Sequence, residues 1–176
     1  MERETGTEGL SRRDVLKRSA VVGGLVWVAP TVLSSSAGAT SNLANCAPSS
    51  RFALKHGAPN EACETPGTNP TTGNCSASAG FTSFRDGCCL ESHGLITFSE
   101  SGNHQTHTYV LASGVELAGA FAKCATDCIG YSPSSSVITV TTDPSTGKTT
   151  VTITCSNLSH SEIVVCFSGS NAPNCP

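Results

Sequence analysis

Ten cysteines in a chain of 176 residues constrain the fold more than any other feature. In a chain that leaves the reducing cytoplasm, an even number of dispersed cysteines is typical of a disulfide framework. The ten disulfide candidates are Cys46, Cys63, Cys75, Cys88, Cys89, Cys124, Cys128, Cys155, Cys166 and Cys175. We therefore expect covalent cross-links to supply stability that apolar burial alone would not, with a connectivity that the sequence leaves open.

The cysteine-bearing part of the chain begins with an irregular stretch. Residues 40 to about 90 contain four prolines and five glycines, which favour turns over long elements. Adjacent Cys88 and Cys89 rarely bond to each other, because the connecting peptide would be strained. Each is expected to bond to a different partner and to anchor this loop at two points.

Regular structure is predicted from Gly94 onward. Two β-type runs, 95–99 and 106–111, flank the turn formers Ser101-Gly102-Asn103 and predict a hairpin. A helix is predicted over about 115–128, because Leu117, Phe121, Cys124 and Cys128 recur at helical spacing. Its two cysteines would share one buried face and form two bridges to neighbouring strands.

The last third of the chain has the clearest β-pattern. Residues 137–142 and 149–155 are rich in β-branched side chains, and the turn formers of 143–148 separate them. Residues 162–167 predict a third strand. The predicted fold class is α+β or mainly β: a small disulfide-rich domain with an irregular N-terminal half, one helix and a C-terminal antiparallel β meander.

The N-terminal segment resembles a twin-arginine export signal. Ser11-Arg12-Arg13-Asp14-Val15-Leu16-Lys17 follows the pattern Ser/Thr-Arg-Arg-x-Phe-Leu-Lys, with Val15 in place of the usual phenylalanine. A 15-residue apolar run, 19–33, is short for a membrane span, and Ala37-Gly38-Ala39 matches a small-x-small cleavage site. The residues that carry the resemblance are Arg12, Arg13, Leu16, Lys17, Ala37 and Ala39.

This resemblance implies a bacterial protein that the twin-arginine translocase carries in a folded state. Signal peptidase would then cleave after Ala39, leaving residues 40–176 as a single cysteine-rich domain. The domain would be secreted or held in the cell envelope, outside the cytoplasmic membrane, with no stable membrane insertion after cleavage. The resemblance covers under a quarter of the chain and implies no activity.

The charge of residues 40–176 excludes one class of partner. Five basic and nine acidic residues give a net charge of −4, spread thinly along the chain. No basic stripe is present to contact phosphates, so nucleic-acid binding is not expected.

Candidate chemistry is sparse. His104 and His107 flank a predicted turn and are the candidate metal ligands, with a third ligand from His93 or Glu100. No motif for a serine or cysteine nucleophile is present, and an even cysteine count suggests no free thiol. The sequence therefore favours a protein without enzyme activity and without a cofactor, and a bound metal is the alternative.

The runs Thr139-Val140-Thr141 and Thr152-Ile153-Thr154 are interpreted as ordinary exposed strand faces rather than a binding ladder.

Three functions remain open at this point. The favoured one is an exported structural or binding protein of unknown ligand. The alternatives are a metal-binding or redox protein that uses His104, His107 and some thiols, and a small hydrolase. One conflict stands out, because cargo that folds in the reducing cytoplasm does not keep disulfides there. Either the fold tolerates late oxidation, which we favour, or a cofactor holds it until export.

Overall fold

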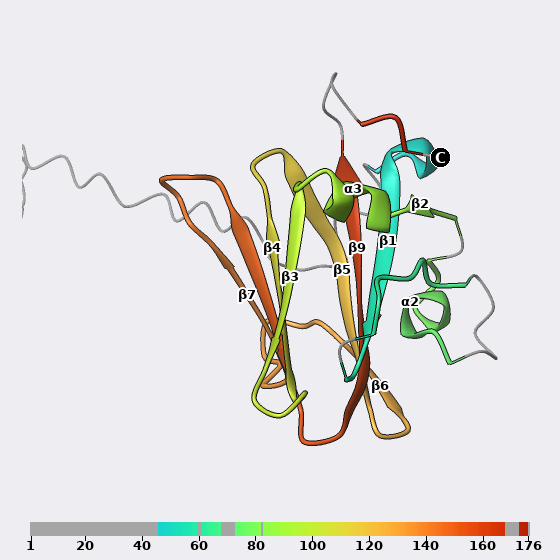
Figure 1. Ribbon diagram of the computed structural model, residues 1–176, viewed down its shortest axis with the longest axis vertical. Helices are drawn as coiled ribbons and strands as arrows, with labels where there is room; N and C mark the ends of the chain where they lie inside the picture. The colour runs from blue at the N-terminus through green and yellow to red at the C-terminus, as the bar shows by residue number, and fades with distance from the viewer. Residues whose placement is uncertain (1–45, 60, 68–72, 82, 168–172, 176) are drawn as a thin grey trace, which may run out of the picture. The chain divides into compact units, whose positions relative to one another are not determined.

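Two β-sheets form the framework of the domain (Figure 1). The computed structural model describes residues 46–59, 61–67, 73–81, 83–167 and 173–175. All described residues lie in one compact unit of the chain. The predicted export signal, its cleavage site and the proposed domain boundary at residue 39 lie outside the described residues and stay predictions.

The five-stranded sheet has the order β2-β1-β9-β5-β6, and the four-stranded sheet has the order β3-β4-β8-β7. Every neighbouring pair of strands is antiparallel except the short parallel pair β1–β2. The strands are β1 Arg51–Gly57, β2 Arg85–Asp86, β3 Ile96–Ser101, β4 Thr106–Leu111, β5 Val115–Cys124, β6 Asp127–Gly130, β7 Ile138–Thr142, β8 Thr149–Thr154 and β9 Leu158–Phe167. Within the described residues, three short helical segments accompany them: η2 Pro48–Ser50, α2 Cys75–Ser78 and α3 Cys88–Ser92.

The main apolar core contains side chains from both sheets. Fully buried residues such as Leu54, Tyr109, Ile153 and Ile163 belong to it. A second, smaller cluster includes Cys75 of α2, together with Phe81, Phe121 and Val164. Alternate residues of β1, β5 and β9 contribute to the two clusters, so these three strands are buried on both faces.

Three sequence predictions are confirmed by the fold. The domain is mainly β and disulfide-rich, with only short helices. The predicted hairpin of 95–99 and 106–111 corresponds to the β3–β4 pair. The strands predicted at 137–142 and 149–155 correspond to the β7–β8 pair, and the predicted strand at 162–167 lies within β9.

The helix predicted at 115–128 is wrong, because this segment forms β5 and β6. Residues 118–122 are all buried, since β5 packs on both of its faces and therefore lacks the period-two alternation of a half-exposed strand. The register of β5 against β9 also shifts between Leu117 and Gly119, and this irregularity interrupts the alternation of side chains between the two faces of the strand. A short apolar run of this kind cannot be distinguished from a helix face by periodicity alone.

Two further expectations need correction. The C-terminal strands do not form one meander, because β9 leaves β7 and β8 and pairs between β1 and β5 in the other sheet. The N-terminal half is not uniformly irregular either. Residues 51–57 form β1, which pairs with β9 along its whole length. The prediction missed β1 because Arg51-Phe-Ala-Leu-Lys-His-Gly57 is buried on both faces and contains few β-branched residues.

All ten cysteines form disulfides, and none is free. The pairs are Cys46–Cys166, Cys63–Cys88, Cys75–Cys128, Cys89–Cys175 and Cys124–Cys155. Adjacent Cys88 and Cys89 do bond to different partners, as predicted. Cys124 and Cys128 also bond to separate partners, although they project from strand ends rather than from a helix.

Neither α2 nor α3 approaches the length of a membrane span. Within the described ranges, no helix is long and apolar enough to cross a bilayer.

Candidate functional site

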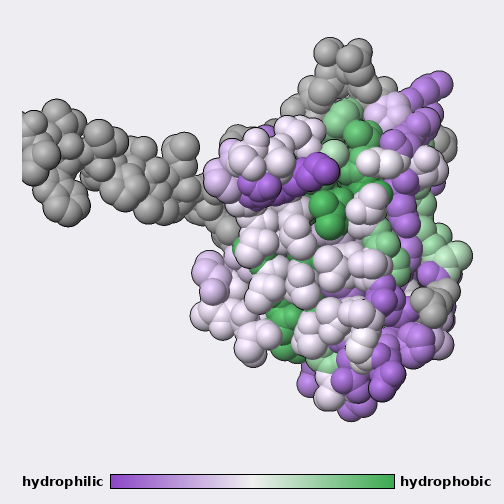
Figure 2. All heavy atoms as spheres, turned by 60° about the vertical axis from the view of Figure 1, so that its left-hand side comes forward, coloured by the Kyte–Doolittle hydropathy of each residue, from purple (hydrophilic) through white to green (hydrophobic). Residues whose placement is uncertain are grey.

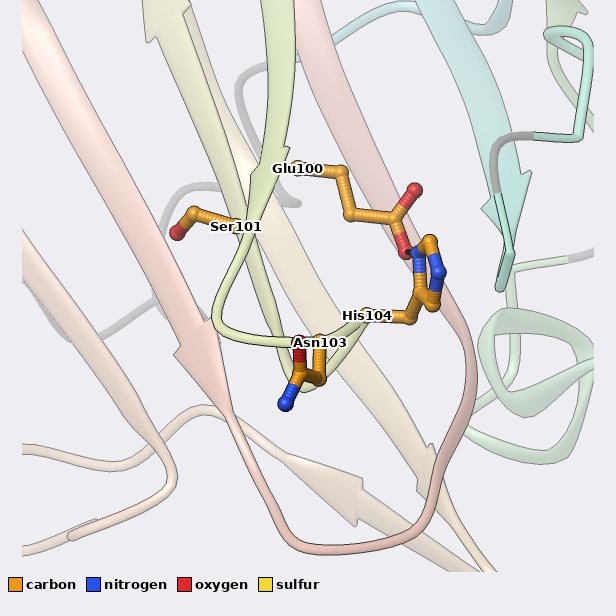
Figure 3. A pocket seen from close by; sticks show the side chains of 4 residues that line it. All are labelled: Glu100, Ser101, Asn103 and His104. Carbon is orange, nitrogen blue, oxygen red and sulfur yellow. Dashed lines mark hydrogen bonds and ion pairs between the residues drawn. The ribbon is translucent and has the colours of Figure 1, made fainter.

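Of the predicted metal pair, His104 lies at the β3–β4 turn with its ring beside the carboxylate of Glu100 (Figure 3), and His107 follows in β4. Glu100 Oε1 lies 2.6 Å from His104 Nδ1 and 3.7 Å from His107 Nε2. The register of the hairpin explains this proximity, since Glu100 is directly opposite His107. His104 is exposed, whereas His107 is fully buried. Glu100 and His104, together with Ser101 and Asn103, line a shallow pocket of about 180 Å³.

The turn does not hold a preformed metal site. Among the described residues, two groups of three potential ligands have all their ligand atoms within 4.8 Å of one another, and Glu100, His104 and His107 are not one of them. His93, the other candidate ligand, follows α3 and is exposed. Metal binding by His104 and His107 therefore stays a prediction that would require the exposed His104 to move.

A buried hydrogen-bonded group lies between the sheets next to this turn. Ser161 Oγ of β9 lies 2.6 Å from both His107 Nδ1 and Tyr109 Oη of β4. Burial lowers the pKa of His107 to about 4, although the Glu100 charge opposes this effect. Burial also raises the pKa of Tyr109 far above its ordinary value. The group is therefore neutral at pH 7 and links the two sheets.

Glu100, His107 and Ser161 are the residue types of a hydrolase triad, but their burial argues against catalysis. Both His107 and Ser161 have no exposed surface. A substrate could reach Ser161 Oγ only if the two sheets separated. Tyr109 Oη also forms a hydrogen bond with Ser161 Oγ, so two side chains already contact this hydroxyl. We interpret the group as a structural contact between sheets.

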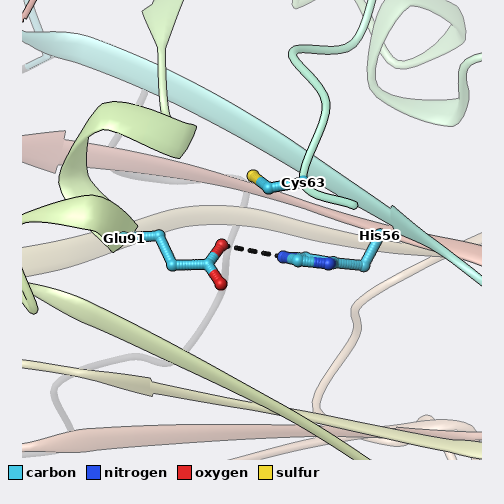
Figure 4. A group of neighbouring side chains, drawn as sticks. All are labelled: His56, Cys63 and Glu91. Atoms are coloured by element: carbon cyan, nitrogen blue, oxygen red, sulfur yellow. Dashed lines mark hydrogen bonds and ion pairs between the residues drawn. The ribbon is translucent and has the colours of Figure 1, made fainter. Parts of the chain in front are cut away.

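The first group of close ligand atoms is His56, Cys63 and Glu91 (Figure 4). His56 Nε2 of β1 donates to Glu91 Oε2 of α3 over 2.8 Å. The imidazole ring stacks on Phe98 with a centroid distance of 3.7 Å, which fixes its orientation. Cys63 is bonded to Cys88 at the start of α3.

The second group is Cys75, His160 and Glu162. The fully buried carboxylate of Glu162 accepts hydrogen bonds from the backbone N–H groups of Cys75 and Ser76, each at 2.8 Å. His160 Nε2 lies 3.0 Å from Glu162 Oε1. Burial alone would raise the pKa of Glu162, but the hydrogen bonds from His160, Ser76 and Cys75 outweigh burial and lower it. Cys75 is bonded to Cys128.

The outer face of the four-stranded sheet forms an array of hydroxyl groups. Strand register aligns eleven side chains in three rows: Ser101-Thr106-Thr154, Ser99-Thr108-Thr152-Thr139 and Thr97-Val110-Thr150-Thr141. Ten of the eleven are serine or threonine, none is charged, and all are exposed or half-buried. Figure 2, in which the left-hand side of Figure 1 comes forward, shows a broad pale surface, the colour of such weakly polar residues. We call these eleven residues the hydroxyl face.

Comparison with known proteins gives no assignment. No protein-family model, no curated protein and no solved structure matches the chain.

Sequence reasoning missed His56, Glu91, His160 and Glu162. Two local signals were present in the sequence: Cys88-x-x-Glu91, with helical i, i+3 spacing, and His160-x-Glu162, with the spacing of one strand face. Neither signal is specific without the long-range pairing that brings β1 and α2 to these positions. The full hydroxyl face is not visible in the sequence for the same reason, because its rows need β3 and β4 beside the β7–β8 hairpin.

Proposed function

We propose that this chain is an exported, disulfide-stabilised protein without enzyme activity that binds a neutral polysaccharide on its hydroxyl face. The observation that carries the proposal is the array of ten hydroxyl side chains on one uncharged sheet face. Each hydroxyl both donates and accepts hydrogen bonds, as the hydroxyls of a sugar polymer do. A polyanion or polycation would find no complementary charge there.

The dimensions of the face favour a chain-like ligand. Neighbouring strands are about 4.8 Å apart, and alternate residues along a strand are about 6.7 Å apart, so the array repeats in two directions. Sheets twist by about 20–25° per strand, which prevents a close match to a flat crystal surface. A flexible polymer can follow the twist and contact several rows at once.

Binding of a neutral glucan by the oxidised protein tests this proposal. Thr108→Val with Thr152→Val removes two adjacent hydroxyls from the middle row and keeps the β-branched shape. We expect glucan affinity to fall about five- to tenfold, which corresponds to the usual contribution of one or two hydrogen bonds. Calorimetry and co-sedimentation with an insoluble glucan measure the change.

Thr126→Val is the matched control, because Thr126 is exposed at the β5–β6 turn, away from the face. Polygalacturonate serves as a charged polymer that should not bind. Absence of glucan binding, or equal binding by the double variant and the parent, contradicts the proposal.

Export through the twin-arginine route is the second part of the proposal. Its support is the resemblance of residues 11–17 to that signal, together with five disulfides that the cytoplasm would not maintain. Arg12→Lys with Arg13→Lys should leave the full-length chain inside the cell. Fractionation and intact-mass analysis check this, and unchanged export of the double variant would rule out the twin-arginine route.

A further inference from the structure

Two of the five disulfides lie beside a histidine and a carboxylate. In both groups, every ligand atom is within 4.8 Å of the others. Among the described residues, the other three disulfides have no histidine and carboxylate grouped this closely with one of their sulfurs. The same combination of residue types therefore recurs at two places formed by different strands and helices.

The first place joins β1, α3 and the loop after β1. Cys88 and Glu91 are three residues apart on α3 and share one side of the helix. The Cys63–Cys88 bond attaches a second sulfur directly to the Cys63 sulfur, which belongs to this group. On reduction this place contains four potential ligands: His56, Cys63, Cys88 and Glu91.

The second place joins β9, α2 and β6. His160 and Glu162 are two residues apart on β9 and share one face of the strand. His160 and Cys128 are both register partners of Lys123, so they also belong to that face of the sheet. On reduction this place contains Cys75, Cys128, His160 and Glu162.

The chemistry of these residues changes with the redox state of the cysteines. A disulfide sulfur is a poor metal ligand, whereas a thiolate is one of the preferred ligands of Zn²⁺. Tetrahedral zinc with bonds of about 2.0–2.3 Å holds its ligand atoms about 3.3–3.8 Å apart. The distances of 2.8 Å between His56 Nε2 and Glu91 Oε2 and 3.0 Å between His160 Nε2 and Glu162 Oε1 are within a few tenths of an ångström of that range.

We propose that the reduced chain binds two Zn²⁺ ions, one at each of these places, and that oxidation replaces each ion by a disulfide. Each site would have two thiolates, one imidazole and one carboxylate as ligands. The metal would hold together the same elements that the disulfide holds in the oxidised protein. A folded, reduced form would then exist before oxidation.

The exchange is balanced as a thiol–disulfide reaction. A low-molecular-weight or protein disulfide outside the cytoplasm is the oxidant and accepts two electrons for each pair of thiolates. One new S–S bond forms in the protein, the S–S bond of the oxidant breaks and its two sulfurs take up two protons from water to become thiols, and Zn²⁺ leaves without changing its own oxidation state. In the reverse direction, a cellular dithiol supplies the two electrons, and zinc binding displaces the thiol protons.

The biological purpose of the exchange rests on the proposed twin-arginine export, because that route requires folded cargo. Zinc binding by the reduced protein does not depend on export and can be measured in vitro. Failure of the zinc experiment and failure of the export experiment are therefore distinguishable.

Metal titration of the reduced full chain tests the proposal. We expect two Zn²⁺ per chain in mass spectrometry under non-denaturing conditions, and none in the oxidised chain. Co²⁺ in place of zinc should give absorption bands of tetrahedral sites with two thiolates. Zinc should also protect the reduced chain from protease, and an oxidised glutathione buffer should release the metal.

Single substitutions separate the two sites. Glu91→Gln and His160→Gln change side chains that are partly exposed, and each should lower the stoichiometry from two ions to one. Cys124→Ser with Cys155→Ser removes a disulfide that has no such neighbours and should keep two ions. His93→Gln, at an exposed histidine outside both sites, should also keep two.

Non-specific binding to the thiols of an unfolded chain predicts a different pattern. In that case, Glu91→Gln and His160→Gln would leave the stoichiometry unchanged, and zinc would give no protection from protease. Either result, or no zinc binding by the reduced chain, overturns the proposal. Near-UV circular dichroism of the oxidised variants checks that each one folds.

Discussion

Ser161 connects the two sheets through one small hydroxyl. It is fully buried and lies 2.6 Å from both His107 Nδ1 and Tyr109 Oη. Ser161→Ala should remove the partner of His107 Nδ1, whereas Tyr109 Oη keeps its 3.2 Å hydrogen bond to the backbone oxygen of residue 161. We expect a loss of about 1–3 kcal/mol in the free energy of unfolding, which is the usual cost of one unsatisfied buried group. Urea denaturation of the oxidised protein measures it, and a loss below about 0.5 kcal/mol would contradict the structural role.

His107 should make stability depend on pH. Its pKa is lowered from 6.5 to about 4 by burial, so between these values the unfolded chain binds a proton that the folded chain does not. Stability is therefore complete above pH 6.5 and falls as the pH drops toward 4, by up to about 1.4 kcal/mol per pH unit. Denaturation curves from pH 7.5 to 4.5 check the slope.

His107→Gln is the variant for comparison, because it removes the titrating ring from the same buried position. Its slope between pH 6.5 and 4.5 should be clearly smaller than that of the parent. Equal slopes would mean that a group other than His107 causes the dependence. The lowered pKa of Glu162 acts in a separate window, below its ordinary value of 4.5.

At the scale of elements, the close approach of α3 to β1 depends on Gly87. A Cβ at this position would lie 2.5 Å from the backbone oxygen of Ala53, which cannot move freely within the sheet. Gly87→Ala should therefore lower the free energy of unfolding by about 1–3 kcal/mol, as overpacking usually does. Gly130→Ala is the control, because the added Cβ would have only ordinary contacts of 3.6 Å or more with Phe121. Equal thermal midpoints for the two variants would contradict the close approach.

The elements also show what the sequence could predict. Strands exposed on one face, such as β4, β7 and β8, alternate between apolar and polar residues and were found. Strands buried on both faces do not alternate, so β1 was missed and β5 was predicted as a helix. The candidate histidines at the β3–β4 turn were found because the turn is local. The groups around His56 and Glu162 depend on contacts between residues up to 87 positions apart, which no local pattern encodes.

For the whole molecule, Cys124–Cys155 is the bridge that joins the two sheets directly. Cys124 ends β5 of one sheet, and Cys155 follows β8 of the other. Replacing both cysteines by serine opens a loop with a sequence separation of 31 residues and should cost roughly 3 kcal/mol. Thermal denaturation of the oxidised variant checks this value. An unchanged melting temperature would show that apolar packing and the hydrogen bonds of Ser161 hold the sheets together without this bridge.

The position of β9 sets a condition on when this protein can fold during its synthesis. β9 is the last of the described strands, yet it is the central strand of its sheet and pairs with β1, the first of them. While the ribosome is still making residues up to 158, β1 has no long partner strand in its own sheet. A nascent chain that ends before β9 should stay accessible to chaperones and proteases, and the five-stranded sheet should assemble only after β9 has been made. Synthesis of β2 to β8 therefore leaves a period in which other cellular factors can act on the unpaired β1.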